Sequence, residues 1–102
     1  MKPEFEERLK HFLGGYWHQD VPSTESGLQD VFVEQSPEDI RELTRIIRTF
    51  LEESADPDSK RAFIDHWADG VVTDDPIGWL QGIMRKMEEF VGWITKASDL
   101  YV

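Results

Sequence analysis

The stretch SPEDIRELTRIIRTFLEES, residues 36–54, carries the strongest helix signal in the chain. Its apolar residues recur every three or four positions, which predicts an amphipathic helix packed against a core. Ser36 is placed to cap the helix start, Pro37 suits the first helical position, and two acidic residues follow in the first turn, where the helix dipole favours them. We expect this helix to end near Ser54. The apolar stripe consists of Ile40, Leu43, Ile47, Phe50 and Leu51.

Two shorter helices are expected before this stretch. The apolar residues between Phe5 and Leu13 share one face of a first helix. We expect Gly14-Gly15 to end that helix, because glycine tolerates the left-handed backbone of a helix C-cap. A second helix is expected around the apolar residues of segment 28–32.

Two further helices are expected after it. Segment 60–68 carries apolar residues at helical spacing, and Asp75-Pro76 repeats the cap and first-turn pattern before a long periodic run that reaches Ile94. Strand signals are weak, since the β-branched residues occur only in very short runs. The chain is therefore expected to be all-α, a single compact domain of about five helices that spans residues 1–102.

Composition supports a folded domain and excludes several kinds of site. The chain has 102 residues, 39% of them hydrophobic, and it includes four Trp and six Phe, which provide large side chains for a core. It has no cysteine, which excludes disulfides, thiolate nucleophiles and cysteine-based zinc sites. The N-terminus has no apolar run and no stretch of about 18 apolar residues occurs, so we expect no signal peptide, no membrane partner and a cytoplasmic location.

The charge is strongly acidic and unevenly distributed. The net charge is −10, and the whole surplus lies in segments 20–42 and 56–75. We expect no direct binding of nucleic acid, because phosphate binding needs Lys and Arg. Two interpretations of the acidic surface stay open: it keeps the protein soluble, or it meets a basic partner.

Signals for metals, cofactors and catalysis are weak. Two of the three histidines, His11 and His18, are separated by the double glycine, so helical spacing does not align them. The segment that begins at Asp56 starts like a calcium loop, but Arg61 replaces its glycine and Trp67 replaces its last glutamate. We expect no metal and no cofactor. His18 and Asp20 are the residue types used in general acid–base catalysis, but a packed, hydrogen-bonded corner is the stronger interpretation, and we expect no enzymatic activity.

The stretch FLGGYWHQD, residues 12–20, resembles the F-L-G-x-Y-[FW]-H-Q-D signature of CdiI-type immunity proteins from bacterial contact-dependent growth inhibition systems. Further matches follow in the same order along the chain: segment 32–39 resembles F-x-x-x-S-P-E-D, segment 46–51 resembles a leucine-rich helix end, and a Trp-Leu pair opens the last helix. The residues that carry the resemblance are Phe12, Leu13, Gly14, Tyr16, His18, Gln19, Asp20, Trp79 and Leu80.

The resemblance implies a protein that binds and neutralises a cognate toxin domain, commonly an RNase or DNase with a basic surface. Such proteins must discriminate one toxin from its relatives, so the shared signature is expected to hold the fold while the interface varies. Segment 56–75 matches no family pattern and is acidic. The toxin is therefore expected to contact Glu52, Glu53, Asp56, Asp58, Asp69, Asp74 and Asp75, of which Asp58 and Asp75 are also candidate helix caps.

Two alternatives remain open at this stage. The first is an acidic adaptor or antitoxin for another basic partner. The second is a small enzyme that uses His18 and Asp20.

Overall fold

The computed structural model describes residues 1–53 and 55–100, and for residues 97–100 it describes the backbone only. Within these residues the chain forms five α-helices and no strand, which confirms the all-α prediction. None of these helices is long and apolar enough to cross a membrane. The helices are α1 (Pro3–Tyr16), α2 (Thr24–Glu34), α3 (Pro37–Glu52), α4 (Pro57–Trp67) and α5 (Pro76–Leu100).

Four of these helices begin at a proline, which is pre-shaped for the first helical position and lacks the N–H that this position would leave unbonded. Ser36 caps α3 as expected, because its hydroxyl accepts a hydrogen bond from the Asp39 backbone N–H at 3.1 Å. Asp75 caps α5 as expected, with the Gly78 N–H donating to its carboxylate at 3.0 Å.

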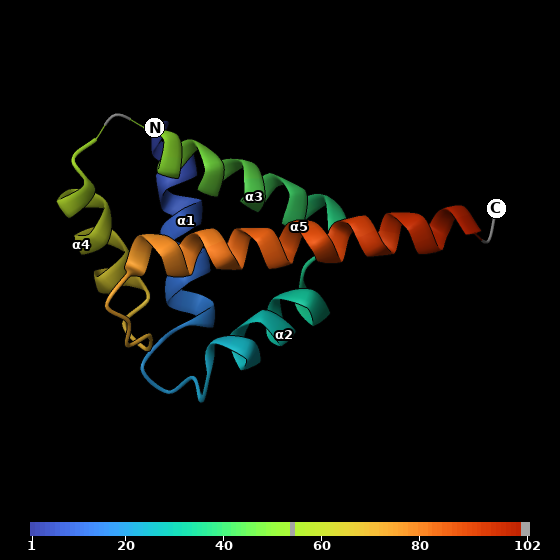
Figure 1. Cartoon of the computed structure of the whole chain (residues 1–102), viewed down its shortest axis with the longest axis horizontal. Coiled ribbons are helices and arrows are strands. Elements are labelled where there is room, and N and C mark those ends of the chain that lie inside the picture. Colours follow the sequence, from blue (N-terminus) through green and yellow to red (C-terminus); the bar gives the residue numbers. More distant parts are fainter. Residues whose placement is uncertain (54, 101–102) are drawn as a thin grey trace.

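The molecule measures 46 × 31 × 22 Å along its three principal axes. The long helix α5 lies along the longest of them (Figure 1). Helix α3 packs along α5 in the most extensive contact between two helices, and α4 packs against the first turns of α5. Helix α1 contacts α2, α3 and α4. The C-terminal end of α5 projects beyond the other helices (Figure 1).

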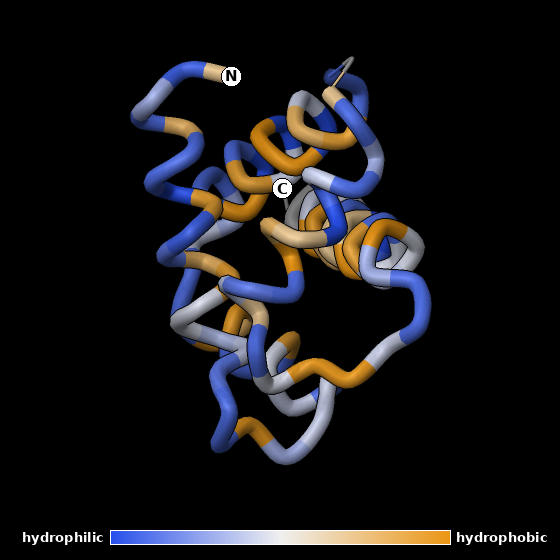
Figure 2. Tube along the Cα trace, turned by 90° about the vertical axis from the view of Figure 1, so that its left-hand side faces the viewer, coloured by the Kyte–Doolittle hydropathy of each residue, from blue (hydrophilic) through white to orange (hydrophobic). Residues whose placement is uncertain are grey.

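A single core collects apolar side chains from all five helices and from the segments that join them. Hydrophobic stretches of the trace turn toward one another inside the molecule, while hydrophilic stretches line its outside (Figure 2). The buried hydrophobic residues are Leu9, Phe12, Leu13, Trp17, Leu28, Val31, Ile40, Leu43, Ile46, Ile47, Phe50, Ile64, Ala68, Leu80, Ile83, Met87 and Val91.

The expected end of the first helix is wrong. Helix α1 continues through Gly14 and Gly15 to Tyr16, and no glycine among the described residues has a positive φ. Gly14 instead lies where α1 approaches α4, since a Cβ at this position would be 3.5 Å from the backbone oxygen of Trp67. The helix ends because the next residue, Trp17, leaves the helical backbone and becomes completely buried.

The expected start of the fourth helix is also wrong. Helix α4 begins at Pro57, three residues before the expected Lys60, and Asp56 is its cap: the Asp56 carboxylate accepts from the Asp58 N–H at 3.3 Å. Asp58 is therefore not a cap, and it forms an ion pair with Arg61 one turn further on. Helix α3 ends at Glu52, and the expected end near Ser54 lies outside the described residues.

Lys60 joins the end of α3 to α4. Its ammonium group donates to the backbone oxygens of Leu51 at 2.9 Å and Glu53 at 2.6 Å. Carbonyl groups at a helix C-terminus have no partner within the helix, so a lysine that binds them satisfies their hydrogen-bonding capacity and complements the negative end of the helix dipole.

Candidate functional site

Aromatic side chains of the signature stretch meet Trp79 at the corner where α1 ends, which we call the aromatic corner. The indole of Trp17 is completely buried there, and its ring packs edge to face against Trp79, with ring centroids 5.2 Å apart, and against Phe12, also at 5.2 Å. The Trp17 Nε1 donates to the backbone oxygen of Thr24 at 3.2 Å, and the Trp79 Nε1 donates to the Thr24 hydroxyl at 3.1 Å. The corner therefore joins α1, α2 and α5 through one threonine.

Sequence reasoning assigned no role to Trp17, although it is the largest completely buried side chain. Trp17 lies inside the signature stretch, residues 12–20, so its place in the family pattern could have identified it. Burial of one aromatic among several neighbours depends, however, on how the chain turns after α1, and this cannot be seen in helical periodicity.

Two glycines let other segments approach this corner closely. The Gly70 N–H donates to the Trp17 backbone oxygen at 2.8 Å, and a Cβ on Gly70 would lie 1.8 Å from the backbone oxygen of His18. A Cβ on Gly27 would lie 2.5 Å from the Trp17 Nε1. Such distances are not sterically allowed, so the corner requires glycine at both positions.

The His-Gln-Asp turn lies on the surface beside this corner. The side chains of His18, Gln19 and Asp20 are all exposed. The His18 Nδ1 accepts a hydrogen bond from the Asp20 backbone N–H at 3.1 Å, and the His18 backbone oxygen accepts from the Val21 N–H at 3.1 Å. The imidazole therefore holds the turn locally. In this arrangement the Asp20 backbone, and not its carboxylate, bonds to the histidine, so the pair lacks the base–carboxylate geometry of an acid–base site.

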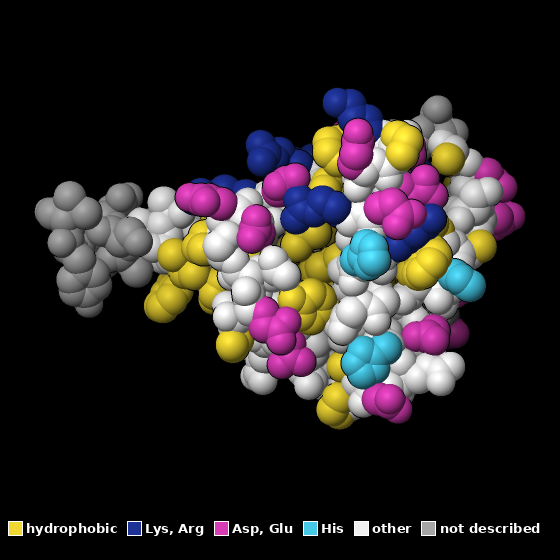
Figure 3. All heavy atoms as spheres, turned by 180° about the vertical axis from the view of Figure 1, so that it is seen from behind, with side chains coloured by type: hydrophobic (Ala, Val, Ile, Leu, Met, Phe, Trp, Pro, Cys, Tyr) yellow, Lys and Arg dark blue, Asp and Glu magenta, His cyan; other side chains and the backbone are white. Residues whose placement is uncertain are grey.

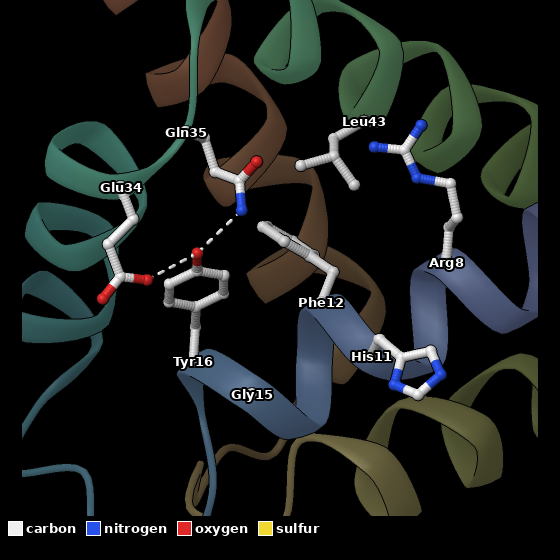
Figure 4. Close-up of a pocket in the computed structure, with 8 residues that line it drawn as sticks. All are labelled: Arg8, His11, Phe12, Gly15, Tyr16, Glu34, Gln35 and Leu43. Atoms are coloured by element: carbon white, nitrogen blue, oxygen red, sulfur yellow. Dashed lines mark hydrogen bonds between the residues drawn. The ribbon is translucent and has the colours of Figure 1, made fainter.

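Tyr16 connects the signature to the end of α2. Its hydroxyl donates to the Glu34 carboxylate at 2.8 Å and accepts from the Gln35 side-chain amide at 2.9 Å (Figure 4). Burial raises the pKa of Tyr16 above its ordinary value, the Gln35 hydrogen bond opposes that rise, and the Glu34 carboxylate adds to it. The bonds join two parts of the chain that both carry the family resemblance.

An open pocket of about 390 Å³ lies beside this tyrosine. Arg8 and His11 extend from α1 on one side of it, and the Tyr16–Glu34–Gln35 group closes the other side (Figure 4). The His11 Nε2 lies 3.8 Å from the Glu7 carboxylate on its own helix. The remaining lining residues are Phe12, Gly15 and Leu43.

The histidines do not form a metal site. Histidine side chains are visible on one face of the molecule, separated from one another by other side chains (Figure 3). His66 packs edge to face on Trp67, with ring centroids 4.8 Å apart. Among the side chains that the structure describes, residues 1–53 and 55–96, no group of three or more His, Asp or Glu is arranged to hold a metal ion.

The seven acidic residues expected to meet a toxin do not form one patch. Four of them lie at the connection between α3 and α4, and the other three lie between α4 and α5, at the opposite end of α4 (Figure 1). An 11-residue helix separates the two groups by roughly 16 Å. The first group is Glu52, Glu53, Asp56 and Asp58, and the second group is Asp69, Asp74 and Asp75.

The two acidic groups also differ in their contacts. In the first group, Glu53 pairs with the amino group of Met1 and Asp58 pairs with Arg61. In the second group, Asp69 and Asp74 are exposed and form no ion pair within the described part of the chain.

Arginines on α3 form a basic groove that sequence reasoning did not single out. Arg41, Arg45 and Arg48 line a groove of about 340 Å³ with Glu88 of α5. Arg48 binds the Glu88 carboxylate at 2.5 Å, and Arg41 donates to the Thr95 hydroxyl at 2.9 Å. These contacts attach α3 to α5, which accounts for two of the three arginines.

Exposed apolar side chains mark another surface that sequence reasoning missed. Trp93 on α5 is 67% exposed and Val33 on α2 is 85% exposed. The two helices are linked beside these residues by Phe32 and Phe90, whose rings stack with centroids 4.0 Å apart and planes 11° apart. We call these four residues the α2–α5 aromatic surface. Trp93 lies off the apolar stripe of α5, and its exposure could have been predicted from this position.

Comparison with protein families gives a match over most of the chain. The model described as "CdiI immunity protein" matches residues 5–87, which is more than half of the chain. No curated protein and no solved structure matches the chain. The matched segment contains the whole aromatic corner and both acidic groups, and it ends before Phe90 and Trp93.

Proposed function

The chain belongs to the CdiI immunity protein family, and we propose that it binds and neutralises the toxin domain of a contact-dependent growth inhibition system. The observation that carries this proposal is the family match, which extends from α1 into α5 and includes the corner built around Trp17. We propose that the whole chain acts as one binding domain.

The proposed toxin is a nuclease, an RNase or a DNase, with a basic surface. A nuclease must attract phosphate groups, so its substrate-binding surface carries Lys and Arg. The net charge of −10 on a chain of 102 residues supports a partner of that kind, because opposite fields accelerate the encounter of two proteins. The proposed site of action is the cytoplasm, where such a toxin meets nucleic acid.

The proposed role is binding and not catalysis. His18 uses its Nδ1 to hold a surface turn, and its partner there is a backbone amide. We assign the signature residues to the scaffold, because Tyr16, Trp79 and the turn at His18 contact other parts of the same chain.

The acidic residues have a proposed role in attracting the toxin. Both acidic groups contribute to the negative field of the molecule, and such a field acts on association more than on dissociation. Asp69 and Asp74 are the strongest candidates for this attraction, because they are exposed and neither caps a helix nor forms an ion pair within the described residues.

The strong acidic charge also favours a second candidate, an adaptor or antitoxin for another basic partner. The experiment that separates the two measures binding of the purified protein to the toxin domain encoded by the adjacent gene, together with inhibition of RNA and DNA cleavage. An unrelated nuclease domain of similar basic charge is the matched control. Tight binding and inhibition of the adjacent toxin alone are expected. Equal binding to both domains favours the adaptor, and binding to neither contradicts both proposals.

A further inference from the structure

We propose that the α2–α5 aromatic surface, made of Phe32, Val33, Phe90 and Trp93, is the site on which the toxin domain docks. This inference rests on the proposed function and adds to it the location of the contact. The acidic groups attract the toxin, and the aromatic surface holds it.

The exposure of Trp93 and Val33 has no explanation within the described part of the chain. Trp93 is 67% exposed and Val33 is 85% exposed, in a protein whose other Trp side chains are buried or partly buried. Exposed apolar side chains that gather on one surface mark interaction sites, whereas single scattered ones are ordinary. Tryptophan is also the residue type most enriched among those that dominate binding energy at protein interfaces.

Trp93 is not needed to hold α5 in place. At this level of the helix, Val91 is buried in the core and the Thr95 hydroxyl accepts a hydrogen bond from Arg41 of α3. The Phe32–Phe90 stack adds a contact to α2. The helix is therefore attached on both sides of Trp93, and the indole remains available for a partner.

The position of the surface suits a contact that is specific to one partner. The family match ends at Met87, so Phe90 and Trp93 lie beyond the shared pattern, whereas Phe32 and Val33 lie within it. Phe90 and Trp93 lie in the second half of α5, whose C-terminal end projects beyond the other helices (Figure 1). Hydrophobic side chains gather there on the outside of the protein (Figure 3). A protein that must select one toxin needs its discriminating contacts outside the part that it shares with its relatives.

The surrounding charge identifies the occupant. Asp30 and Glu34 are exposed on α2 on either side of Val33, and Glu89 is exposed one turn before Trp93, while Lys96 is the base one turn after it. A second copy of the chain would bring the same acids against themselves, since a two-fold interface pairs a patch with its own equivalent. Anionic lipid would also be repelled. The surface therefore fits a basic protein that offers an apolar pocket for the indole, with Lys or Arg around it.

The test compares three variants in binding to the purified toxin domain encoded by the adjacent gene. Trp93→Ala and Val33→Ser alter the proposed surface. Val72→Ser is the matched control, because Val72 is a fully exposed valine in the connection between α4 and α5, at the other end of the molecule. We expect Trp93→Ala to weaken binding at least about 10-fold, mainly through faster dissociation. Val33→Ser should weaken binding less, and Val72→Ser should match the parent.

A second measurement does not depend on the alanine variant folding. The immunity protein is labelled with 5-fluorotryptophan, and the Trp93 resonance is identified as the one that Trp93→Phe removes. Adding unlabelled toxin should shift or broaden this resonance, while the resonance of the buried Trp17 serves as an internal reference.

The outcomes separate this inference from the proposed function. If the parent binds and inhibits the toxin but Trp93→Ala binds equally well and the Trp93 resonance does not change, the docking site is wrong and the immunity function stands. If the parent does not bind the toxin, both fail. If sedimentation shows a dimer of the parent that Trp93→Ala abolishes while toxin binding is unchanged, the surface belongs to a second copy and the inference is overturned.

Discussion

The rings of Trp17 and Trp79 meet edge to face, with centroids 5.2 Å apart and planes at 89°, and both indole nitrogens donate to Thr24. Trp17 follows the first helix and Trp79 opens the last one, so the contact joins the two ends of the matched family segment. An edge-to-face aromatic pair contributes roughly 0.5–1.5 kcal/mol beyond the area that it buries. Five predictions follow from this corner, from its neighbours and from the charge of the molecule.

Removing the Thr24 hydroxyl should destabilise the fold. In Thr24→Val the Trp79 N–H loses its acceptor in a partly buried position, which should cost about 1–3 kcal/mol of unfolding free energy. Thr24→Ser keeps the hydroxyl and is the matched control. Denaturant unfolding measures both variants, and equal stability of the two would show that this hydrogen bond contributes nothing.

Gly70→Ala should destabilise the protein strongly, because its Cβ would lie 1.8 Å from the His18 backbone oxygen, and backbone cannot move as a side chain can. Gly82→Ala is the control: Gly82 lies within α5 with nothing within 4 Å of an added Cβ. Alanine is favoured over glycine inside a helix by about 1 kcal/mol, so this variant should be as stable as the parent or more stable. Thermal unfolding checks the pair, and a Gly70→Ala variant with parental stability would contradict the close approach.

His18→Ala should cost little. The sequence alone suggested a packed, hydrogen-bonded corner, but the structure shows an exposed side chain whose bond to the Asp20 N–H is open to water. The expected loss is therefore about 0.5–1.5 kcal/mol, the ordinary net value of a hydrogen bond. Toxin binding by the folded variant should be unchanged. A variant of parental stability that no longer binds would place the turn inside the interface.

Tyr16 predicts a loss of stability at high pH. Its pKa is raised in the folded protein, so folding favours the protonated hydroxyl. The corresponding stability is fully present below the ordinary tyrosine pKa of about 10 and is lost as the pH rises through the higher folded pKa. Tyr16→Phe lacks this contribution, so the difference in unfolding free energy between parent and variant should shrink across that range.

Denaturant unfolding at increasing pH tests this prediction, and tyrosinate absorbance in a Tyr101→Phe background follows Tyr16 as the sole tyrosine. The unfolding measurements are made in the same Tyr101→Phe background. A parent–variant difference that stays constant through the titration would contradict it.

Removing acidic charge should slow association with the toxin. Asp69→Asn combined with Asp74→Asn removes two negative charges without touching a helix cap. Association should slow and depend less on salt, while dissociation stays nearly unchanged. Arg85→Gln combined with Lys86→Gln makes the protein more acidic by the same amount, and it should accelerate association. Stopped-flow kinetics at several salt concentrations measures these rates. Faster dissociation of the aspartate variant would place Asp69 or Asp74 inside the contact.

The sequence alone determined the elements that depend on local interactions. Helical spacing of apolar residues located all five helices, and the caps at Ser36 and Asp75 were confirmed, because a cap is a bond between residues three positions apart. Two helix boundaries were predicted wrongly, because the local sequence patterns that mark them were misinterpreted. The Asp56-Pro57 cap was overlooked, and Gly14-Gly15 was taken as a helix end, although glycine also permits a helix to approach its neighbour.

Only the tertiary structure decided which residues these helices bring together. Trp17 is buried because the turn after α1 is enclosed by Gly27 of α2 and by Gly70 of the connection between α4 and α5. The acidic residues of segment 52–75 divide into two groups because an intervening helix holds its two ends apart. The exposed Trp93 lies one turn after Phe90, and only the packing of α2 against α5 brings the Phe90 ring onto that of Phe32.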